Sequence, residues 1–109
     1  INDLNPLKYA RMAKSYFKSI KGKRVLILGI AYKPNISDVR ESASLTLIRE
    51  LRKMGAIVFW HDEFVKSWNG EFSTPISGKF DLAIVATPHS GVDLTKIKPT
   101  PILNPGKSF

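Results

Sequence analysis

The sequence predicts a small α/β fold, a Rossmann-like parallel sheet flanked by helices and preceded by a long N-terminal connector helix. Two observations lead to this prediction. Short, continuous apolar runs at residues 24–29, 57–60 and 80–87 are typical of strands buried on both faces. A segment of helical periodicity at 42–54 lies between the first two runs, so strand and helix alternate as in a doubly wound sheet.

The chain begins with a predicted helix. Asp3 or Asn5 is available as its N-cap, and Pro6 suits the first turn. Apolar residues then recur at helical spacing among lysines: Leu7, Ala10, Ala13, Tyr16, Phe17 and Ile20. Gly22, between two lysines, is expected to end this helix as its C-cap glycine.

The elements that follow alternate in type. The helix at 42–54 has one apolar face, formed by Leu45, Ile48 and Leu51. Gly55 follows it as the C-cap. Residues 64–78 are the least regular part, with turns marked by Trp68, Asn69-Gly70 and Pro75. A short helix at 88–97 and a last strand at 101–104 complete the prediction.

The 109 residues suffice for one hydrophobic core. No strand precedes the first helix, so we expect residues 1–22 to be a connector from something N-terminal and residues 23–109 to form the α/β domain. No apolar run reaches the length of a membrane span, no signal sequence is recognised, and the cytoplasm is the expected compartment.

The composition restricts the possible chemistry. Cysteine is absent, so this chain contains no disulfide, thiolate metal site or thiol nucleophile. The formal charge of +8 fits either an anionic partner or a solvated lysine surface. A nucleic-acid role is the weaker alternative, because no aromatic residues are interleaved with the basic ones as in an RNA-binding motif.

Ligands of an open parallel sheet bind at the carboxyl ends of its strands. The segments expected at that edge are residues 29–42, 61–64, 87–91 and 104–107. The first is long for a strand-to-helix connection, and long ordered loops are often functional. Its polar and charged residues are Tyr32, Lys33, Asn35, Ser37, Asp38, Arg40, Glu41 and Ser42.

These side chains allow two interpretations. Lys33 could meet a phosphate, Tyr32 could flank a base, and Arg40 could clamp a carboxylate or pyrophosphate. Alternatively, Asp38, Arg40 and Ser42 form a network of caps and ion pairs that only holds the loop. The loop lacks the Gly-x-Gly-x-x-Gly fingerprint after the strand, which argues against an NAD pyrophosphate site here.

Other candidate residues follow the second and third strands. His61 and His89 could each act in hydrogen bonding or acid-base chemistry, although a lone histidine is more often structural. Asp62 could bond a ribose hydroxyl or cap the following turn. No His, Asp or Glu pair at helical spacing indicates a metal site.

The run from Lys23 to Asn35, continued by Ser37-Asp38-Val39-Arg40-Glu41-Ser42, closely resembles the C-terminal UDP-binding domain of the UDP-glucose/GDP-mannose dehydrogenase family. The family pattern here is a strand, Gly-x-Ala-(Tyr/Phe)-Lys, a spacer and Asp-x-Arg-Glu-Ser. Asn2-Asp3 with Pro6 is similar to the entry into the helix that links the family's central dimerisation region to this domain. The resemblance covers nearly the whole chain and is weakest at 64–79.

The resemblance implies an NAD-dependent oxidation of a sugar C6 alcohol to a carboxylate, with NAD bound mainly by an N-terminal domain and the catalytic cysteine upstream. It also implies a homodimer of the full-length enzyme, and a fragment that is inactive alone. Residues carried over as substrate-binding are Tyr32, Lys33, Asn35, Ser37 and Asp38. Arg40 would reach towards the NAD side of the interdomain cleft.

Two places depart from the family pattern. Where the family often carries an arginine after the last strand, this chain has Lys107, which would substitute for it in binding substrate. The second strand ends in His61-Asp62-Glu63 rather than Tyr-Asp-Pro. Residues 87–90 (Thr-Pro-His-Ser) are closer to members that act on UDP-N-acetylhexosamines, such as the mannosamine-type enzymes, than to those acting on UDP-glucose.

Overall fold

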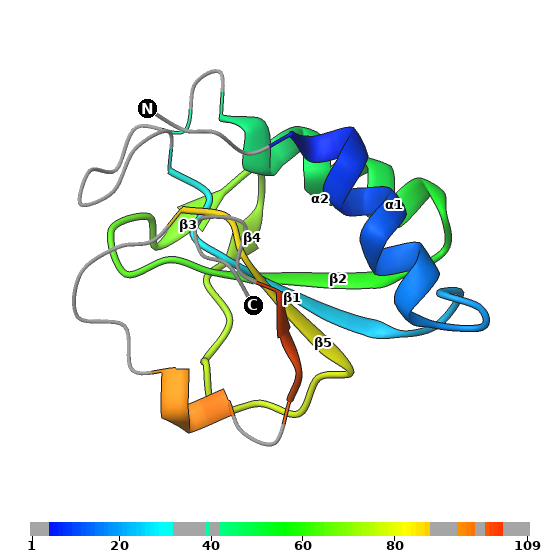
Figure 1. The fold of residues 1–109 in the computed structure, drawn as a ribbon. Coiled ribbons are helices and arrows are strands. Elements are labelled where there is room, and N and C mark those ends of the chain that lie inside the picture. Colours follow the sequence, from blue (N-terminus) through cyan, green and yellow to red (C-terminus); the bar gives the residue numbers. More distant parts are fainter. Residues whose placement is uncertain (1–4, 32–38, 40–41, 88–93, 98–99, 104–109) are drawn as a thin grey trace.

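The fold is built on one parallel sheet of four strands, with two helices on one face (Figure 1). This computed structural model describes residues 5–31, 39, 42–87, 94–97 and 100–103. The strands are β1 (Arg24–Leu28), β2 (Ile57–His61), β5 (Leu82–Val85) and β6 (Ile102–Leu103), in the order β2-β1-β5-β6. The parallel sheet and its helices confirm the predicted fold class.

The two central strands are apolar at almost every position because both faces of the sheet are covered. Val25 and Ile27 of β1 point into the core beneath the helices, whereas Leu26 and Leu28 join the cluster on the opposite face. On that second face Ile97, in the short 3₁₀ helix η1 (Leu94–Ile97), is 1% exposed. Residues 88–93 of the helix predicted at 88–97 lie outside the described residues.

Helix α1 (Pro6–Tyr16) begins as predicted and ends earlier. The side chain of Asn5 accepts from the amide of Lys8 at 3.1 Å, and Pro6 occupies the first turn. We expected the helix to reach Gly22, and this was wrong. Phe17 is already extended, and the chain turns so that Ile20 enters the core at 3% exposure. Ile20 therefore continues the helical spacing of apolar residues because it is buried in the core, although it lies beyond the end of the helix.

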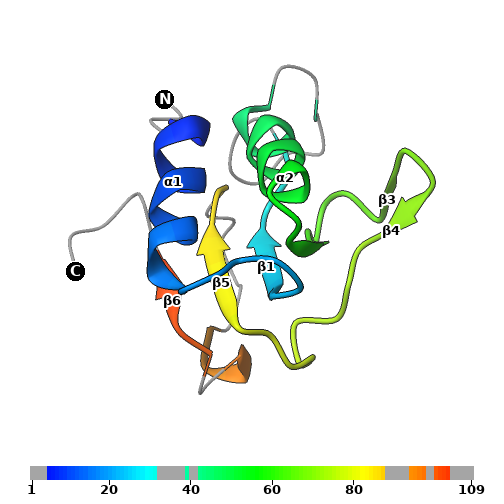
Figure 2. The same cartoon turned by 90° about the vertical axis from the view of Figure 1, so that its right-hand side faces the viewer.

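Helix α2 (Ala43–Lys53) matches the prediction closely, with Ser42 as N-cap and Gly55 after its end at a φ of 96°. It packs beside α1 on the same face of the sheet, as Figure 2 shows. The boundary placed between residues 22 and 23 stays a prediction. Ala10 and Ala13 of α1 nevertheless belong to the same core cluster as β1 and α2.

The segment expected to be irregular contains a hairpin that the sequence analysis missed. Strands β3 (Ser67–Trp68) and β4 (Glu71–Phe72) pair antiparallel around Asn69 and Gly70, whose φ angles are 51° and 78°. Two successive positive φ angles are characteristic of a type I′ turn, for which Asn-Gly is the favoured sequence. Such short strands give no periodic signal, so only the turn was recognised.

A bidentate ion pair joins this hairpin to α2. The guanidinium of Arg52 donates to both carboxylate oxygens of Glu71, at 2.9 and 2.8 Å, and also to the carbonyl oxygen of Val58 at 2.9 Å. Hydrogen bonds from Arg52 hold the pKa of Glu71 below its usual 4.5. Both side chains are more than a third exposed, so solvent screens the pair.

The ion pair predicts an acid-sensitive contribution to stability. Because the pKa of Glu71 is lowered in the folded chain, the contribution is complete above the unfolded pKa and is lost as the pH falls through the folded one. Glu71→Gln should lower the free energy of unfolding at neutral pH by about 0.2 to 1 kcal/mol. Urea unfolding well below pH 4.5 should show no such difference. Glu50→Gln, in the exposed Lys53–Glu50 pair on α2, controls for the lost charge. An equal deficit for Glu71→Gln at both pH values would contradict the assignment.

Candidate nucleotide-binding edge

The strand order creates a switch point between β1 and β5. From β1 the chain passes through α2 to β2 on one side, and from β5 it passes through η1 to β6 on the other. Connections that leave neighbouring parallel strands in opposite directions open a crevice at their carboxyl ends, the usual ligand position in such sheets. The described residues at this edge are 29–31, 62 and 86–87, together with the start of α2.

Gly29 ends β1 in a position that a larger residue would not fit. Its φ is 90°, and a Cβ there would collide with the carbonyl oxygen of Thr87 and lie 2.7 Å from the Thr87 Cβ. Its amide donates to the carbonyl oxygen of His61 at 2.7 Å. The amides of Ala86 and Thr87 both donate to the Leu28 carbonyl. The glycine therefore permits the ends of β1 and β5 to approach closely before the chain enters the loop.

Asp62 is a buried acid that binds the first residues of the loop after β1, Ile30 and Ala31, which we call the loop stem. Only 2% exposed, it follows β2, and its Oδ2 accepts from the amides of Ile30 and Ala31 at 2.8 and 3.1 Å. Its Oδ1 accepts from the amides of Phe64 and Val65 at 2.8 and 3.1 Å. The expectation that Asp62 caps the following turn is confirmed, and the same carboxylate also holds the residues after β1.

Hydroxyl groups hold the loop stem from the other side. Thr87 Oγ1 donates to the Ala31 carbonyl at 2.6 Å, and Ser42 Oγ donates to the same carbonyl at 3.5 Å. Ser44 Oγ lies 3.4 Å from Thr87 Oγ1, and Ser42 Oγ accepts from the Ser44 amide at 3.2 Å. These three side chains are buried. The loop therefore leaves from, and returns to, one buried polar cluster.

This arrangement bears on whether the strand end could hold a dinucleotide. In a Gly-x-Gly-x-x-Gly turn, backbone amides after the first strand are offered to the pyrophosphate. Here the amides of Ile30 and Ala31 already donate to Asp62. The described stem therefore does not fit NAD pyrophosphate, in agreement with the missing fingerprint.

His61 has a structural contact rather than an open position at the edge. Its Nδ1 lies 2.8 Å from the carbonyl oxygen of Thr74, whose amide donates to the Trp60 carbonyl at 2.7 Å. A carbonyl can only accept, so Nδ1 carries the proton in this pair.

Among the described residues, no group of three or more His, Asp or Glu side chains could hold a metal ion. Nor does any helix within these ranges have the length and apolarity to cross a membrane.

The residues predicted to bind ligand lie outside the described part of the chain: Tyr32, Lys33, Asn35, Ser37, Asp38, Arg40 and Lys107. His89 lies outside it as well. Of the proposed capping network, Ser42 is confirmed as the N-cap of α2, and Asp38 and Arg40 stay predictions. The roles of Thr87 and Ser44 in holding the stem were not predicted from the sequence. A hydroxyl residue at a strand end or in a first helical turn is too common to signal such a contact.

Residues 26–104 match the UDP binding domain of the UDP-glucose/GDP-mannose dehydrogenase family. The chain belongs to this family. The match includes the last three residues of β1, the whole loop, α2 and the remaining strands, so the resemblance predicted from the loop is confirmed.

Individual relatives agree with the family assignment. The chain is 36% identical over 62 residues to the putative UDP-glucose 6-dehydrogenase YtcA of Bacillus subtilis, a match covering 57% of this chain and 14% of that protein. It is 36% identical over 56 residues to a UDP-N-acetyl-D-mannosamine dehydrogenase of Campylobacter jejuni, covering 51% and 14%. The match thus spans about a seventh of these curated relatives.

A solved structure shows the same fold over almost the whole chain. The UDP-glucose dehydrogenase of the hyperthermophilic archaeon Pyrobaculum islandicum superposes with a TM-score of 0.76 at 25% identity. The superposition covers 91% of this chain and 25% of that one. The four-stranded sheet with its helices is thus a family architecture.

Gly29→Ala should destabilise the domain by about 3 kcal/mol or more, because the left-handed backbone and the collision with Thr87 both oppose a side chain. Gly22→Ala is the matched control: its φ is 78° with no atom within 4 Å of an added Cβ, so only the backbone strain of about 1 kcal/mol applies. Urea unfolding measures both. Equal losses would show that the close approach to β5 is unimportant.

Asp62→Asn should cost about 2 to 4 kcal/mol, because an amide group would replace one carboxylate oxygen and leave two backbone amides without their acceptor. Asp81→Asn is the control: its exposed carboxylate accepts from the single amide of Arg24, so about 1 kcal/mol or less is expected. Thermal unfolding compares them. Unchanged stability with weakened nucleotide binding would instead make Asp62 a ligand of the ribose.

Proposed function

We propose that this chain is the UDP-sugar-binding domain of an NAD-dependent nucleotide-sugar 6-dehydrogenase, which oxidises the sugar C6 alcohol to a carboxylate. The observation that carries the proposal is the family match over residues 26–104, which contains the entire loop at the switch point. The net charge of +8 complements a diphosphate ligand. The cytoplasm stays the expected compartment.

The proposed ligand contacts come from the loop and the chain end. Lys33 would pair with the diphosphate as a point charge, and Tyr32 would flank the nucleotide. Asn35, Ser37 and Asp38 would continue the substrate-binding surface along the loop. Lys107, after the last strand, would add a second positive charge. Arg40 would face the NAD side of the cleft.

The buried stem supports this role physically. Asp62 holds the amide of Ala31, and Thr87 holds its carbonyl, so the residue immediately before Tyr32 has little freedom. A site that binds from a preorganised backbone loses less conformational entropy when the ligand arrives. We infer that the cluster at the strand ends serves to present Tyr32 and Lys33 to the nucleotide sugar.

The chemistry would be completed by parts that this chain does not contain. NAD would accept hydride from the sugar when bound, mainly on another domain, and a cysteine there would be the nucleophile at the aldehyde level. This chain contains no cysteine, so we expect residues 1–109 to bind nucleotide sugar without oxidising it. The complete enzyme is expected to be a homodimer.

The identity of the sugar is a finer proposal. Relatives named for UDP-glucose and for UDP-N-acetyl-D-mannosamine both match this chain. The Thr-Pro-His-Ser sequence at 87–90 favours a UDP-N-acetylhexosamine. Titrating UDP-N-acetylmannosamine and UDP-glucose in parallel against the chain tests this preference.

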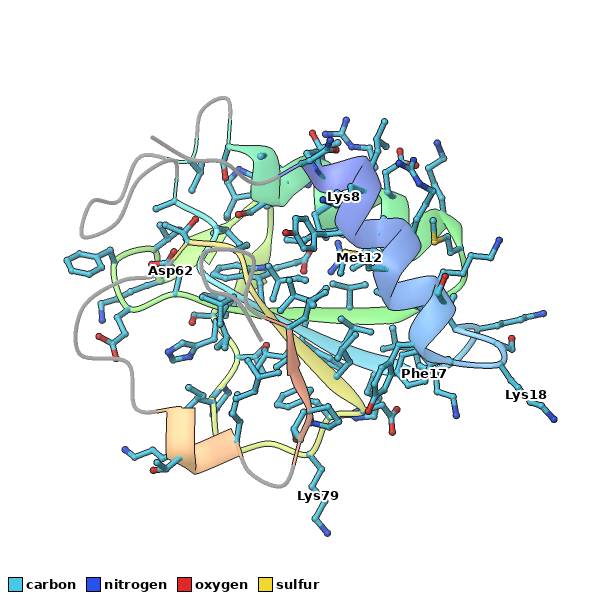
Figure 3. The ribbon with its side chains drawn as sticks, in the orientation of Figure 1. Lys8, Met12, Phe17, Lys18, Asp62 and Lys79 are labelled. Atoms are coloured by element: carbon cyan, nitrogen blue, oxygen red, sulfur yellow. The ribbon has the colours of Figure 1, made fainter. Side chains whose placement is uncertain are left out.

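Calorimetric titration with UDP tests the binding function. Lys33→Ala should weaken UDP binding about 10- to 100-fold, because one charge-assisted contact to phosphate is lost. Lys79→Ala removes an equal charge at the opposite edge of the sheet and should bind like the parent (Figure 3). Equal losses in both variants, with the same affinity for any polyanion and a steep salt dependence, would instead indicate a nonspecific nucleic-acid-binding module.

A further inference from the structure

An open groove runs between α1 and the β6 side of the sheet. Five residues of α1 line one wall at successive helical turns: Lys8, Arg11, Met12, Ser15 and Tyr16. Ala13 and Leu82 line its base, and residues 101–103 line the other side. We call this the α1–β6 groove.

Large apolar side chains of α1 are exposed along the groove. Met12 is 40% exposed and Tyr16 56% exposed, whereas Ala10 and Ala13 on the inner face are buried. Lys8 and Met12 lie along the helix in Figure 3. Within the described residues, β6 is the last strand on this side of the sheet, and Ile102 and Leu103 are only half buried. Contiguous exposed apolar residues beside a sheet edge are typical of an interaction surface.

The charged side chains that line this groove have one sign. Residues 5–31 contain seven basic side chains and no acidic one: Lys8, Arg11, Lys14, Lys18, Lys21, Lys23 and Arg24. Lys8 and Arg11 line the groove directly, with no carboxylate among the lining residues that the structure describes. An occupant that complements this surface needs apolar side chains over Met12 and Tyr16 and carboxylates near Lys8 and Arg11.

This requirement distinguishes among occupants. A second copy of this chain would bring the same basic groove, and like charges facing each other oppose association. An acidic segment covalently joined to the domain needs no high affinity, because tethering raises its effective concentration. The matches spanning only about a seventh of the curated relatives leave ample chain in such enzymes to supply one.

We propose that the α1–β6 groove is the docking site for an acidic, apolar-faced segment of the same enzyme, located outside residues 1–109. The inference rests on the proposed function, in that it assigns the chain to a larger dehydrogenase. Docking there would fix the domain relative to the rest of the enzyme from the side opposite η1.

The two methionines of the chain provide a test. Met12 lies in the groove, and Met54, at the end of α2, is partly buried and outside it. Methionine oxidation by hydrogen peroxide depends on exposure. In the 109-residue chain, Met12 should oxidise faster than Met54, as measured by peptide mass spectrometry. In the complete product of the reading frame, without nucleotide, Met12 should oxidise no faster than Met54.

Charge reversal tests the recognition. In the complete protein, Lys8→Glu/Arg11→Glu should restore rapid Met12 oxidation, because it places like charges against the acidic segment. Lys18→Glu/Lys21→Glu makes the same charge change outside the groove lining and should leave Met12 protected. Circular dichroism and thermal unfolding of each variant check that the protein is folded before the comparison.

Three outcomes would overturn the proposal. Met12 could oxidise equally fast in both proteins, so that nothing covers the groove. Protection of the 109-residue chain that rises with its concentration would identify a second copy as occupant. Protection only on phosphatidylglycerol vesicles would identify a lipid surface. Because no nucleotide is present, these results are independent of the UDP titration, so each proposal can fail separately.

Discussion

The carboxylate of Asp62 is the interaction on which the binding edge depends. It joins the end of β2 to the residues after β1 by accepting from two amides on each side. Four backbone amides at a buried strand end would otherwise need other partners, since buried unpaired donors are costly. One acid therefore shapes two loops, and the path of the chain into the family's characteristic loop follows from it.

The sheet around this carboxylate holds the strand ends close together. Core residues cover both faces of β1, and Gly29 lets β1 approach the end of β5 so closely that Thr87 can reach the Ala31 carbonyl. Apolar burial holds the strands, and the polar cluster holds the stem of the loop.

The basic residues of the chain fall into groups with different proposed roles. Lys33, Arg40 and Lys107 belong to the proposed nucleotide-sugar site. Lys8 and Arg11 belong instead to α1, which packs on the helical face of the sheet, beside a groove with apolar residues in it. Composition alone yields a single net charge of +8 and cannot divide it. The proposed site for a small anion and the proposed surface for an acidic segment thus use different basic residues.

The sequence by itself determined the strands of the main sheet, α2 with its caps, and the family, because apolar periodicity, glycine at helix ends and the 29–42 motif are local properties. Only the tertiary structure decided the strand order, the entry of Ile20 into the core beyond α1, and the β3–β4 hairpin. It also revealed the contacts of Asp62 with the loop stem, whose residues lie 31 and 32 positions away. Contacts at that separation depend on how the strands pack, and no local pattern encodes them.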